Sequence, residues 1–220
     1  KGDQDKALDY YGRSLAIKEE LGDKLGMGYS LNSIGVVHEN RGEYDKALEY
    51  YERSLKIRED IGDKRGMGDT LNNIGIVHLN KGEYDKTLEY FDKSLKIYEE
   101  LGDKAGMGAS LNNIGIVHER KGEYDKALDY YDRSLKIQEE IGDKYGMGIT
   151  LGNIGIVHYY KGEYDKAAEH LEKSLSIHKE IDFKAIELNT TTYLYLSYKN
   201  LGKDYDVKEI HSLIKEAENI

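Results

Sequence analysis

The fold is decided by the stretch Arg41–Asn80, which reads RGEYDKALEYYERSLKIREDIGDKRGMGDTLNNIGIVHLN. Further copies of this 40-residue stretch begin at Lys81, Lys121 and Lys161. Residues 1–20 repeat its first half, and a divergent copy closes the chain. A fixed period of this length is typical of a stack of identical supersecondary units. The sequence therefore predicts a repeat array, in which each unit contacts only its neighbours.

Each copy is predicted to form a hairpin of two helices. Side chains that suit a buried face recur at intervals of four, three and four residues, which marks one side of a helix: Met67, Leu71, Ile74 and His78. We name this helix A and expect it over residues 64–80, with Asp63 as its N-cap. Helix B is expected over residues 44–60, and its inner face should carry Tyr44, Ala47, Tyr51, Ser54, Leu55 and Arg58.

Glycine marks the ends of these helices, because the chain contains no proline. Gly62 and Gly82 follow the periodic stretches, where a left-handed residue commonly ends a helix. Gly75 is different, since it lies inside helix A, where glycine costs ~1 kcal/mol relative to alanine. Its return as Gly35, Gly115 and Gly155 predicts that a neighbouring helix approaches too closely for a Cβ atom.

Composition excludes several classes of function. The 220 residues carry a net charge of −10, and no run of lysine or arginine forms a basic patch, so we expect no nucleic-acid partner. No apolar run is long enough to span a membrane, and no signal peptide is visible. Cysteine is absent, which fits an intracellular, cytoplasmic protein. The chain begins inside a repeat at Lys1, so we expect it to be part of a longer protein.

The repeat resembles the tetratricopeptide repeat. The positions that carry the resemblance are Leu71, Ile74, Gly75, His78, Gly82, Tyr84, Thr87, Phe91, Ser94 and Leu95. His78 stands where the family has tyrosine, Ser94 replaces its second alanine, and the terminal proline is missing. The 40-residue form, with GDKxGMG between units and LNNIG in helix A, is similar to the long repeats of Pins-type adaptors and related microbial regulators.

This resemblance implies an all-α, right-handed superhelical solenoid of antiparallel helix hairpins, with the A helices lining a concave groove. We expect one solenoid over residues 1–220. Its parts are a lone helix B over residues 1–20, repeats over 21–60, 61–100, 101–140 and 141–180, and a degenerate C-terminal capping repeat over 181–220. Terminal repeats are commonly atypical because they cap the core. The total expected is eleven helices.

No constellation in the sequence indicates catalysis, so we expect neither an enzyme nor a cofactor. A histidine recurs every forty residues, at His38, His78, His118 and His158. A metal ladder is one interpretation, but each histidine occupies the family's buried aromatic position and none has a second ligand at the spacing of a zinc helix. The recurring serines, such as Ser54, have no base nearby and are interpreted as small residues between helices.

Comparison of the copies with one another indicates where a partner binds. The changes within helix A fall on one stripe opposite its buried face, and in the family this stripe lines the groove. The candidate partner-binding residues are Tyr29, Asn32, Val36, Asp69, Asn72, Ile76, Asn112, Ile116, Tyr145, Ile149, Ile156, Tyr159 and Tyr160.

The stripe contains two nearly constant rows. One row is amide, from Asn32 through Asn72 and Asn112 until Gly152 interrupts it, and the other is aliphatic, from Val36 to Ile156. Amides can hydrogen-bond a peptide backbone whatever its side chains. We therefore expect the first half of the groove to bind the backbone and charged side chains of a ligand. The tyrosine-rich second half is expected to bind an apolar side chain. The alternative is that the Asn row only spaces the helices.

Two functions remain from different classes. The first is an interaction scaffold that binds a peptide or protein segment in the groove. The second is a structural scaffold that self-associates through the open first helix or through the groove of a neighbour.

Overall fold

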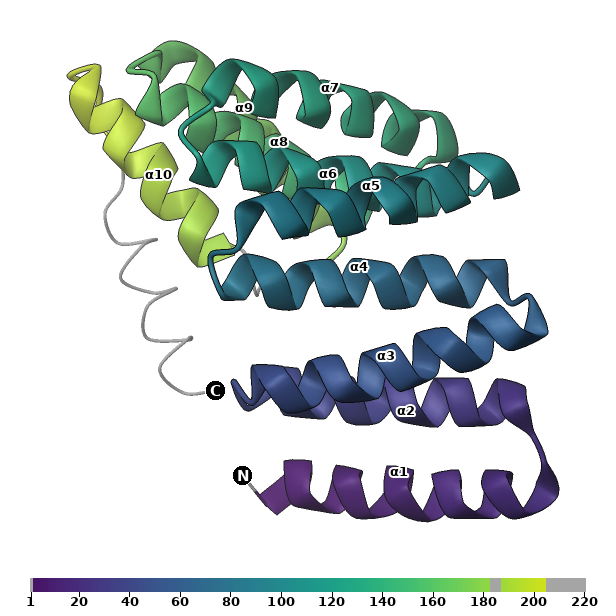
Figure 1. Cartoon of the computed structure of the whole chain (residues 1–220). Helices are drawn as coiled ribbons and strands as arrows, with labels where there is room; N and C mark the ends of the chain where they lie inside the picture. The colour runs from purple at the N-terminus through teal and green to yellow at the C-terminus, as the bar shows by residue number, and fades with distance from the viewer. Residues whose placement is uncertain (1, 183–186, 205–220) are drawn as a thin grey trace. The chain divides into compact units, whose positions relative to one another are not determined.

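The computed structural model describes residues 2–182 and 187–204, and every regular element within them is an α-helix (Figure 1). The helices are α1 (Gly2–Leu21), α2 (Lys24–Asn40), α3 (Tyr44–Ile61), α4 (Lys64–Asn80), α5 (Tyr84–Leu101), α6 (Lys104–Arg120), α7 (Tyr124–Ile141), α8 (Lys144–Tyr160), α9 (Tyr164–Glu180) and α10 (Glu187–Asn200). Across this part of the chain, none of them combines the length and hydrophobicity that crossing a membrane requires.

The chain divides into two compact units, residues 1–106 (unit 1) and 107–220 (unit 2). In unit 1, α1 packs on α2, α2 on α3, α3 on α4, and α4 on α5; in unit 2, α7 packs on α8, α8 on α9, and α9 on α10 (Figure 1). Helices α2, α4, α6 and α8 are the predicted A helices, and α1, α3, α5, α7 and α9 are the B helices. The all-α fold of antiparallel hairpins is thus confirmed.

Helix boundaries follow the sequence signals closely. Helix α4 has the predicted range, and α3 extends one residue beyond the range expected for helix B. The Asp63 side chain accepts a hydrogen bond of 3.0 Å from the Gly66 amide, as an N-cap does. Gly62 ends α3 with a φ of 70°, a left-handed conformation that glycine adopts without steric cost. The eleventh expected helix falls on residues outside the described part of the chain.

The recurring glycine inside each A helix faces a large side chain of the following B helix. A Cβ atom on Gly75 would lie 2.5 Å from Cε1 of the Phe91 ring, and one on Gly35 would lie 2.5 Å from Cε1 of Tyr51. Phe91 and Tyr51 are fully buried by this contact. The glycine therefore admits a ring against the helix backbone, which is the close approach that its position predicted.

The recurring serine of the B helices hydrogen-bonds the preceding A helix. Ser54 Oγ donates a 2.8 Å hydrogen bond to the Gly28 carbonyl oxygen of α2, and Ser94 Oγ donates one of 2.9 Å to Gly68 of α4. Both serines are fully buried. The carbonyl oxygen thereby accepts a second hydrogen bond, which comes from the partner helix. This bond holds the two helices at one position along each other.

The recurring histidine joins the two helices at the turn between them. In each copy, its Nδ1 atom lies 2.8 Å from the Oε2 atom of the glutamate five residues later, as in the pairs His38–Glu43 and His78–Glu83. The His78 ring also stacks on Tyr90 of α5, with ring centroids 5.2 Å apart. The histidine is thus buried between helices, as the sequence predicted.

These glutamates are held in their charged form. A hydrogen bond from Lys86 lowers the pKa of Glu83, and the bond from His78 lowers it further. The same two kinds of neighbour lower the pKa of Glu43, Glu123 and Glu163. A lowered folded-state pKa gives stability that is present above the ordinary carboxyl pKa and is lost as pH falls through the folded value.

Helix α10 packs against α9 within unit 2. Leu194 of α10 is buried together with Leu171 and Leu175 of α9, and the half-buried Tyr193 and Tyr198 pack against this cluster. The first described helix of the divergent tail therefore covers apolar surface of the last complete repeat.

Substitution of Gly75 tests the glycine–ring contact. Gly75→Leu should lower the free energy of unfolding by about 1–3 kcal/mol, because the new side chain has to displace the Phe91 ring. Gly12 is the matched control, since it is exposed within α1 and a Cβ there would meet nothing within 4 Å. Gly12→Ala should instead stabilise by about 0.5–1 kcal/mol. Urea unfolding measures both, and a Gly75→Leu protein as stable as the parent would contradict the contact.

Substitution of Glu83 tests the histidine–glutamate junction. Glu83→Gln should lower stability at neutral pH and should lose less stability than the parent between pH 7 and pH values below ~4, because the glutamine has no charge to lose. Glu52→Gln, on the exposed face of α3, serves as the control. Urea unfolding across this pH range gives both curves, and parallel curves for Glu83→Gln and the parent would disprove the linkage.

Candidate functional site

The outward stripe of two A helices, α2 and α8, carries exposed apolar side chains of the kind expected of a binding surface. Among the described residues, exposed large hydrophobics lie on α2 and α8, on α1, and at the last residues of α3, α5 and α7. The A-helix members are Leu25, Tyr29, Val36, Tyr145 and Tyr160. The exposed middle of the B helices α5, α7 and α9 instead carries charged pairs, namely Lys93–Glu89, Arg133–Asp129 and Lys173–Glu169. The two surfaces therefore differ in chemistry.

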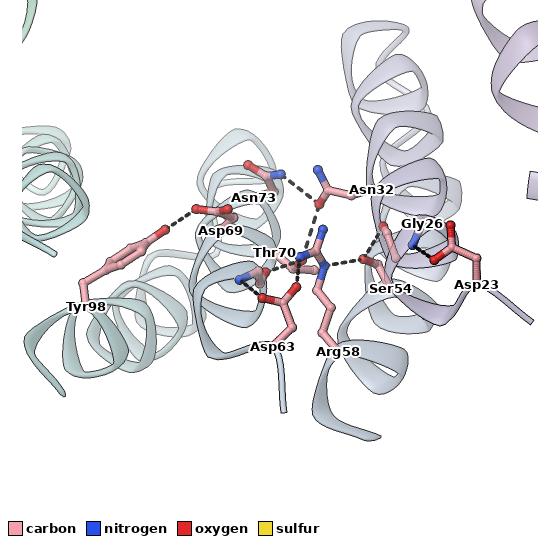
Figure 2. A network of polar contacts seen from close by, with 12 residues as sticks. Asp23, Gly26, Asn32, Ser54, Arg58, Asp63, Asp69, Thr70, Asn73 and Tyr98 are labelled. Atoms are coloured by element: carbon pink, nitrogen blue, oxygen red, sulfur yellow. Dashed lines mark hydrogen bonds and ion pairs between the residues drawn. The ribbon is translucent and has the colours of Figure 1, made fainter. Parts of the chain in front are cut away.

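In unit 1, the variable stripe positions engage residues of the following B helix. The Tyr29 ring covers the guanidinium of Arg58, with Cζ of Arg58 4.7 Å from the ring centroid. Asp69 accepts a 2.6 Å hydrogen bond from the Tyr98 hydroxyl, as Figure 2 shows. Burial raises the pKa of Tyr98, and the bond to Asp69 raises it further. Tyr29 and Asp69 are exposed, so each still presents a surface to solvent.

The amide row has a structural use that the groove hypothesis did not include. Asn32 Oδ1 accepts a 3.2 Å hydrogen bond from Asn73 Nδ2 of the next A helix (Figure 2). In unit 2, Asn112 Oδ1 accepts from Thr150 at 3.2 Å and from Asn153 at 3.1 Å. Asn112 is buried and Asn72 is half-buried. These bonds join adjacent A helices, which is the role that the alternative interpretation assigned to the row.

The aliphatic row is more buried than a continuous docking strip would be. Val36 is exposed, but Ile76, Ile116 and Ile156 are half-buried. Ile116 packs against the core of α7 and α8, and Ile156 packs against that of α9 and α10. Most of the row therefore fills space between helices, and only its edge reaches the surface.

The predicted tyrosines of unit 2 form a stacked cluster at the end of α8. Tyr160 is 51% exposed and stacks on Tyr124 with ring centroids 6.1 Å apart, while Tyr159 is half-buried. Tyr160 and Tyr193 share a hydrogen bond of 2.6 Å between their hydroxyls. Burial and this hydrogen bond raise the pKa of Tyr193 to about 12. The Tyr159 ring meets the Tyr193 ring edge-on, with centroids 5.3 Å apart. Both tyrosines of α8 therefore contact α10, and Tyr160 also presents a ring to solvent.

A cavity of about 210 Å³ lies at the other end of α8, between α6, α8 and the last turn of α7. It brings the predicted residues Tyr145, Ile149 and Asn112 together. The remaining lining residues are Ala109, Asn113, Gln138, Asp143, Gly146 and Thr150. Tyr145 is half-exposed and Ile149 half-buried, so both lie at the rim of this cavity. The cavity is a place on the stripe that could hold a partner side chain.

The structure shows a column of buried polar residues that comparison of the A helices alone missed. It occupies one position of helix B and changes in every copy: Lys18, Arg58, Tyr98, Gln138 and His178. The last four are at most 5% exposed. The signal was present in the sequence, since a residue that varies at a buried position of otherwise constant helices indicates a variable environment. Gln138 belongs both to this column and to the cavity.

Metal-ligating side chains do not gather in the described part of the chain, where no group of three or more His, Cys, Asp or Glu is found. The recurring histidines use Nδ1 for their glutamates, as in His118–Glu123 at 2.8 Å.

Comparisons with known proteins agree with this architecture. A sequence profile described as tetratricopeptide repeat matches residues 1–60, 66–140 and 106–180. A search of curated proteins gave no match. Among solved structures, BtubC from P. vanneervenii is similar with a TM-score of 0.80 and 18% identity, over 98% of this chain and 90% of that one.

Two further solved structures show the same likeness of fold. Aspartyl phosphate phosphatase F from Bacillus subtilis has a TM-score of 0.82 at 17% identity, over 96% of this chain and 54% of that one. The Rap conjugation gene regulator of plasmid pLS20, solved in complex with a Phr peptide, has a TM-score of 0.76 at 18% identity, over 92% and 56%. This chain therefore spans about half of either protein.

The profile match covers most of the sequence, and its boundaries follow the helix hairpins seen in the structure. The chain belongs to the tetratricopeptide repeat family.

Proposed function

We propose that this chain is a protein-interaction scaffold that binds an extended peptide segment along the outward surface of its A helices. The observation that carries the proposal is the contrast between the two kinds of helix. Exposed tyrosine and aliphatic side chains lie on the A helices α2 and α8, and Tyr145 of α8 borders a cavity, whereas the middle of the B helices α5, α7 and α9 presents charged pairs. Tyrosine at a partly exposed position is typical of an interface anchor.

The fold supports this function because the similar Rap regulator was solved with a peptide bound. The identity between the two chains is 18%, so the likeness concerns the fold alone. The binding residues are therefore inferred from the side chains of this chain. The amide row contributes less to our proposal than the sequence suggested, since the side-chain oxygens of Asn32 and Asn112 bond the next A helix. Tyr145 and Ile149 at the cavity rim are the proposed anchors.

The proposal is one of binding without a chemical step. The recurring serines and histidines, which are groups suited to nucleophilic or general-base chemistry, make structural contacts in the described hairpins. Ser54 donates to the Gly28 carbonyl, and His38 pairs with Glu43. The net charge of −10 favours a protein partner over a nucleic acid, because phosphate backbones attract basic surfaces.

Self-association is a second candidate function, and helix α1 favours it. Tyr10, Ile17 and Leu21 are 66%, 57% and 74% exposed, and their spacing of seven and four residues places them on one face of the helix. This face could pair with a second copy of the chain.

The scaffold proposal predicts that truncation of the two proposed anchors, Tyr145 and Ile149, weakens the binding of peptides. The ligands are random 12-residue peptides selected by phage display on the purified chain and then labelled for fluorescence anisotropy. Tyr145→Ala with Ile149→Ala should weaken binding at least about tenfold, since truncation of anchor residues commonly costs more than 1 kcal/mol each.

The matched control is Tyr10→Ala with Ile17→Ala, which removes the same side-chain types from α1. Its affinity should equal that of the parent. If the control loses affinity and the rim variant does not, α1 rather than the A-helix surface binds the peptides.

Self-association through α1 predicts that the average molecular mass in solution rises with protein concentration. Tyr10→Lys with Leu21→Lys should abolish the rise, because two charges would then face the same surface on the other copy. Light scattering after size exclusion measures this mass. A parent chain that stays monomeric at every concentration would eliminate self-association through α1.

A further inference from the structure

The cavity in unit 2 contains a buried acceptor whose partner is missing from the described residues. Gln138 is 4% exposed, and its Oε1 atom makes no hydrogen bond in the described part of the chain. Buried carboxamide oxygens are almost always paired, and this one lines the cavity. A ligand that donates a hydrogen bond there would satisfy it.

A carboxylate lies beside the Gln138 carboxamide. Asp143 Oδ1 accepts a 2.9 Å hydrogen bond from the Gly146 amide and so caps α8. A Cβ atom on Gly146 would collide with both Asp143 Oδ2 and Gln138 Nε2, so the two side chains meet over this glycine. No ion pair of Asp143 is found among the described residues, whereas the equivalent Asp63 and Asp103 pair with arginines.

One of the equivalent positions in unit 1, that of Arg58, shows a group that fits such a place. The 40-residue period aligns Gln138 with Arg58 and Asp143 with Asp63. Arg58 is 1% exposed, and its Nη1 donates to Asp63 Oδ2 at 2.5 Å while its Nε donates to Ser54 Oγ at 3.2 Å (Figure 2). The chain itself thus buries a guanidinium between a carboxylate and the Tyr29 ring.

In unit 2 the carboxylate is kept, but the guanidinium and the ring above it are absent. Glutamine is shorter than arginine and uncharged. Ala109 occupies the position in the hairpin of Gln138 that Tyr29 occupies in the hairpin of Arg58. The space that these two changes leave is open to solvent on the side of Tyr145, which replaces Arg65. An aromatic ring therefore borders the cavity from the other wall.

We propose that this cavity binds the guanidinium of an arginine side chain from the partner segment, in the place that Arg58 fills in unit 1. The inference rests on the proposed peptide-binding function and names the residue that the second half of the surface selects. Asp143 and the Gln138 carboxamide oxygen accept the hydrogen bonds, and the Tyr145 ring offers a stacking surface. It differs from the sequence-based expectation, which was an apolar side chain there.

Arginine is favoured over lysine for a physical reason. Two acceptors on different side chains match the planar fork of five N–H donors in a guanidinium, whereas an ammonium is a compact and strongly hydrated point charge. The negative net charge of the chain also attracts a cationic segment and speeds its association.

The test uses N-acetyl-arginine amide, N-acetyl-lysine amide and N-acetyl-citrulline amide as probes of the full chain. Amide chemical shifts of Ala109, Gly146 and Ile149 are followed by ¹⁵N NMR during titration. The arginine probe should produce saturable shifts, and the lysine and citrulline probes should bind at least about tenfold more weakly, which corresponds to 1.4 kcal/mol. Equal binding of all three, or no shift with arginine, would overturn the proposal.

Two variants locate the binding. Asp143→Asn keeps a residue that caps helices well but removes the charge, and it should weaken the arginine probe at least about fivefold. Gln138→Arg supplies the guanidinium from within, as Arg58 does, so it should abolish binding and raise the melting midpoint by about 2–4 °C. A folded Gln138→Arg protein that binds the arginine probe like the parent would show that the cavity is not the site.

The two proposals fail in distinguishable ways. If selected peptides lose affinity in the Tyr145→Ala and Ile149→Ala double variant but no probe shifts the cavity amides, the scaffold function stands and the arginine site is wrong. If the arginine probe binds but no selected peptide depends on the rim, the cavity recognises guanidinium and the peptide surface lies elsewhere.

Discussion

The structure depends on one contact, in which a large side chain of each B helix lies against a glycine of the preceding A helix. Phe91 meets Gly75, Tyr51 meets Gly35, Tyr131 meets Gly115, and Leu171 meets Gly155. A side chain at the glycine would keep the helices apart and would expose the residues that flank it. Because the contact removes about the whole side chain from water, its hydrophobic gain offsets the ~1 kcal/mol that glycine costs inside a helix.

The sequence was sufficient for the fold because its signals are local and repeated. The predicted helix 64–80, the Asp63 cap and the left-handed Gly62 all appear in the structure. The site was less predictable, since it depends on which side chains meet between helices. Asn32 looked free to bind a partner, but Asn73 of the next helix donates to its oxygen. Sequence periodicity places a residue on a face and cannot show that another side chain already occupies its hydrogen-bonding atoms.

The buried polar column could have been identified from the sequence, and its chemistry could not. Arg58, Tyr98 and Gln138 occupy one position of nearly constant helices, which marks a variable place. Their roles required the structure, because Arg58 reaches Asp63 on the following loop, Tyr98 reaches Asp69 on the preceding A helix, and Gln138 Oε1 faces a cavity. Length and reach of the side chain decide between these outcomes.

Near-identical repeats carry a risk of mispairing, because a B helix can pack on the wrong A helix with almost the same core. The pairs across each hairpin reduce this risk. Arg58 lies under Tyr29, and Tyr98 donates to Asp69. Exchange of α3 and α5 would place Tyr98 beside Tyr29 and remove the acceptor for its hydroxyl. In unit 1, the two matched pairs therefore favour α3 on α2 and α5 on α4, and so oppose the exchange of these two near-identical helices.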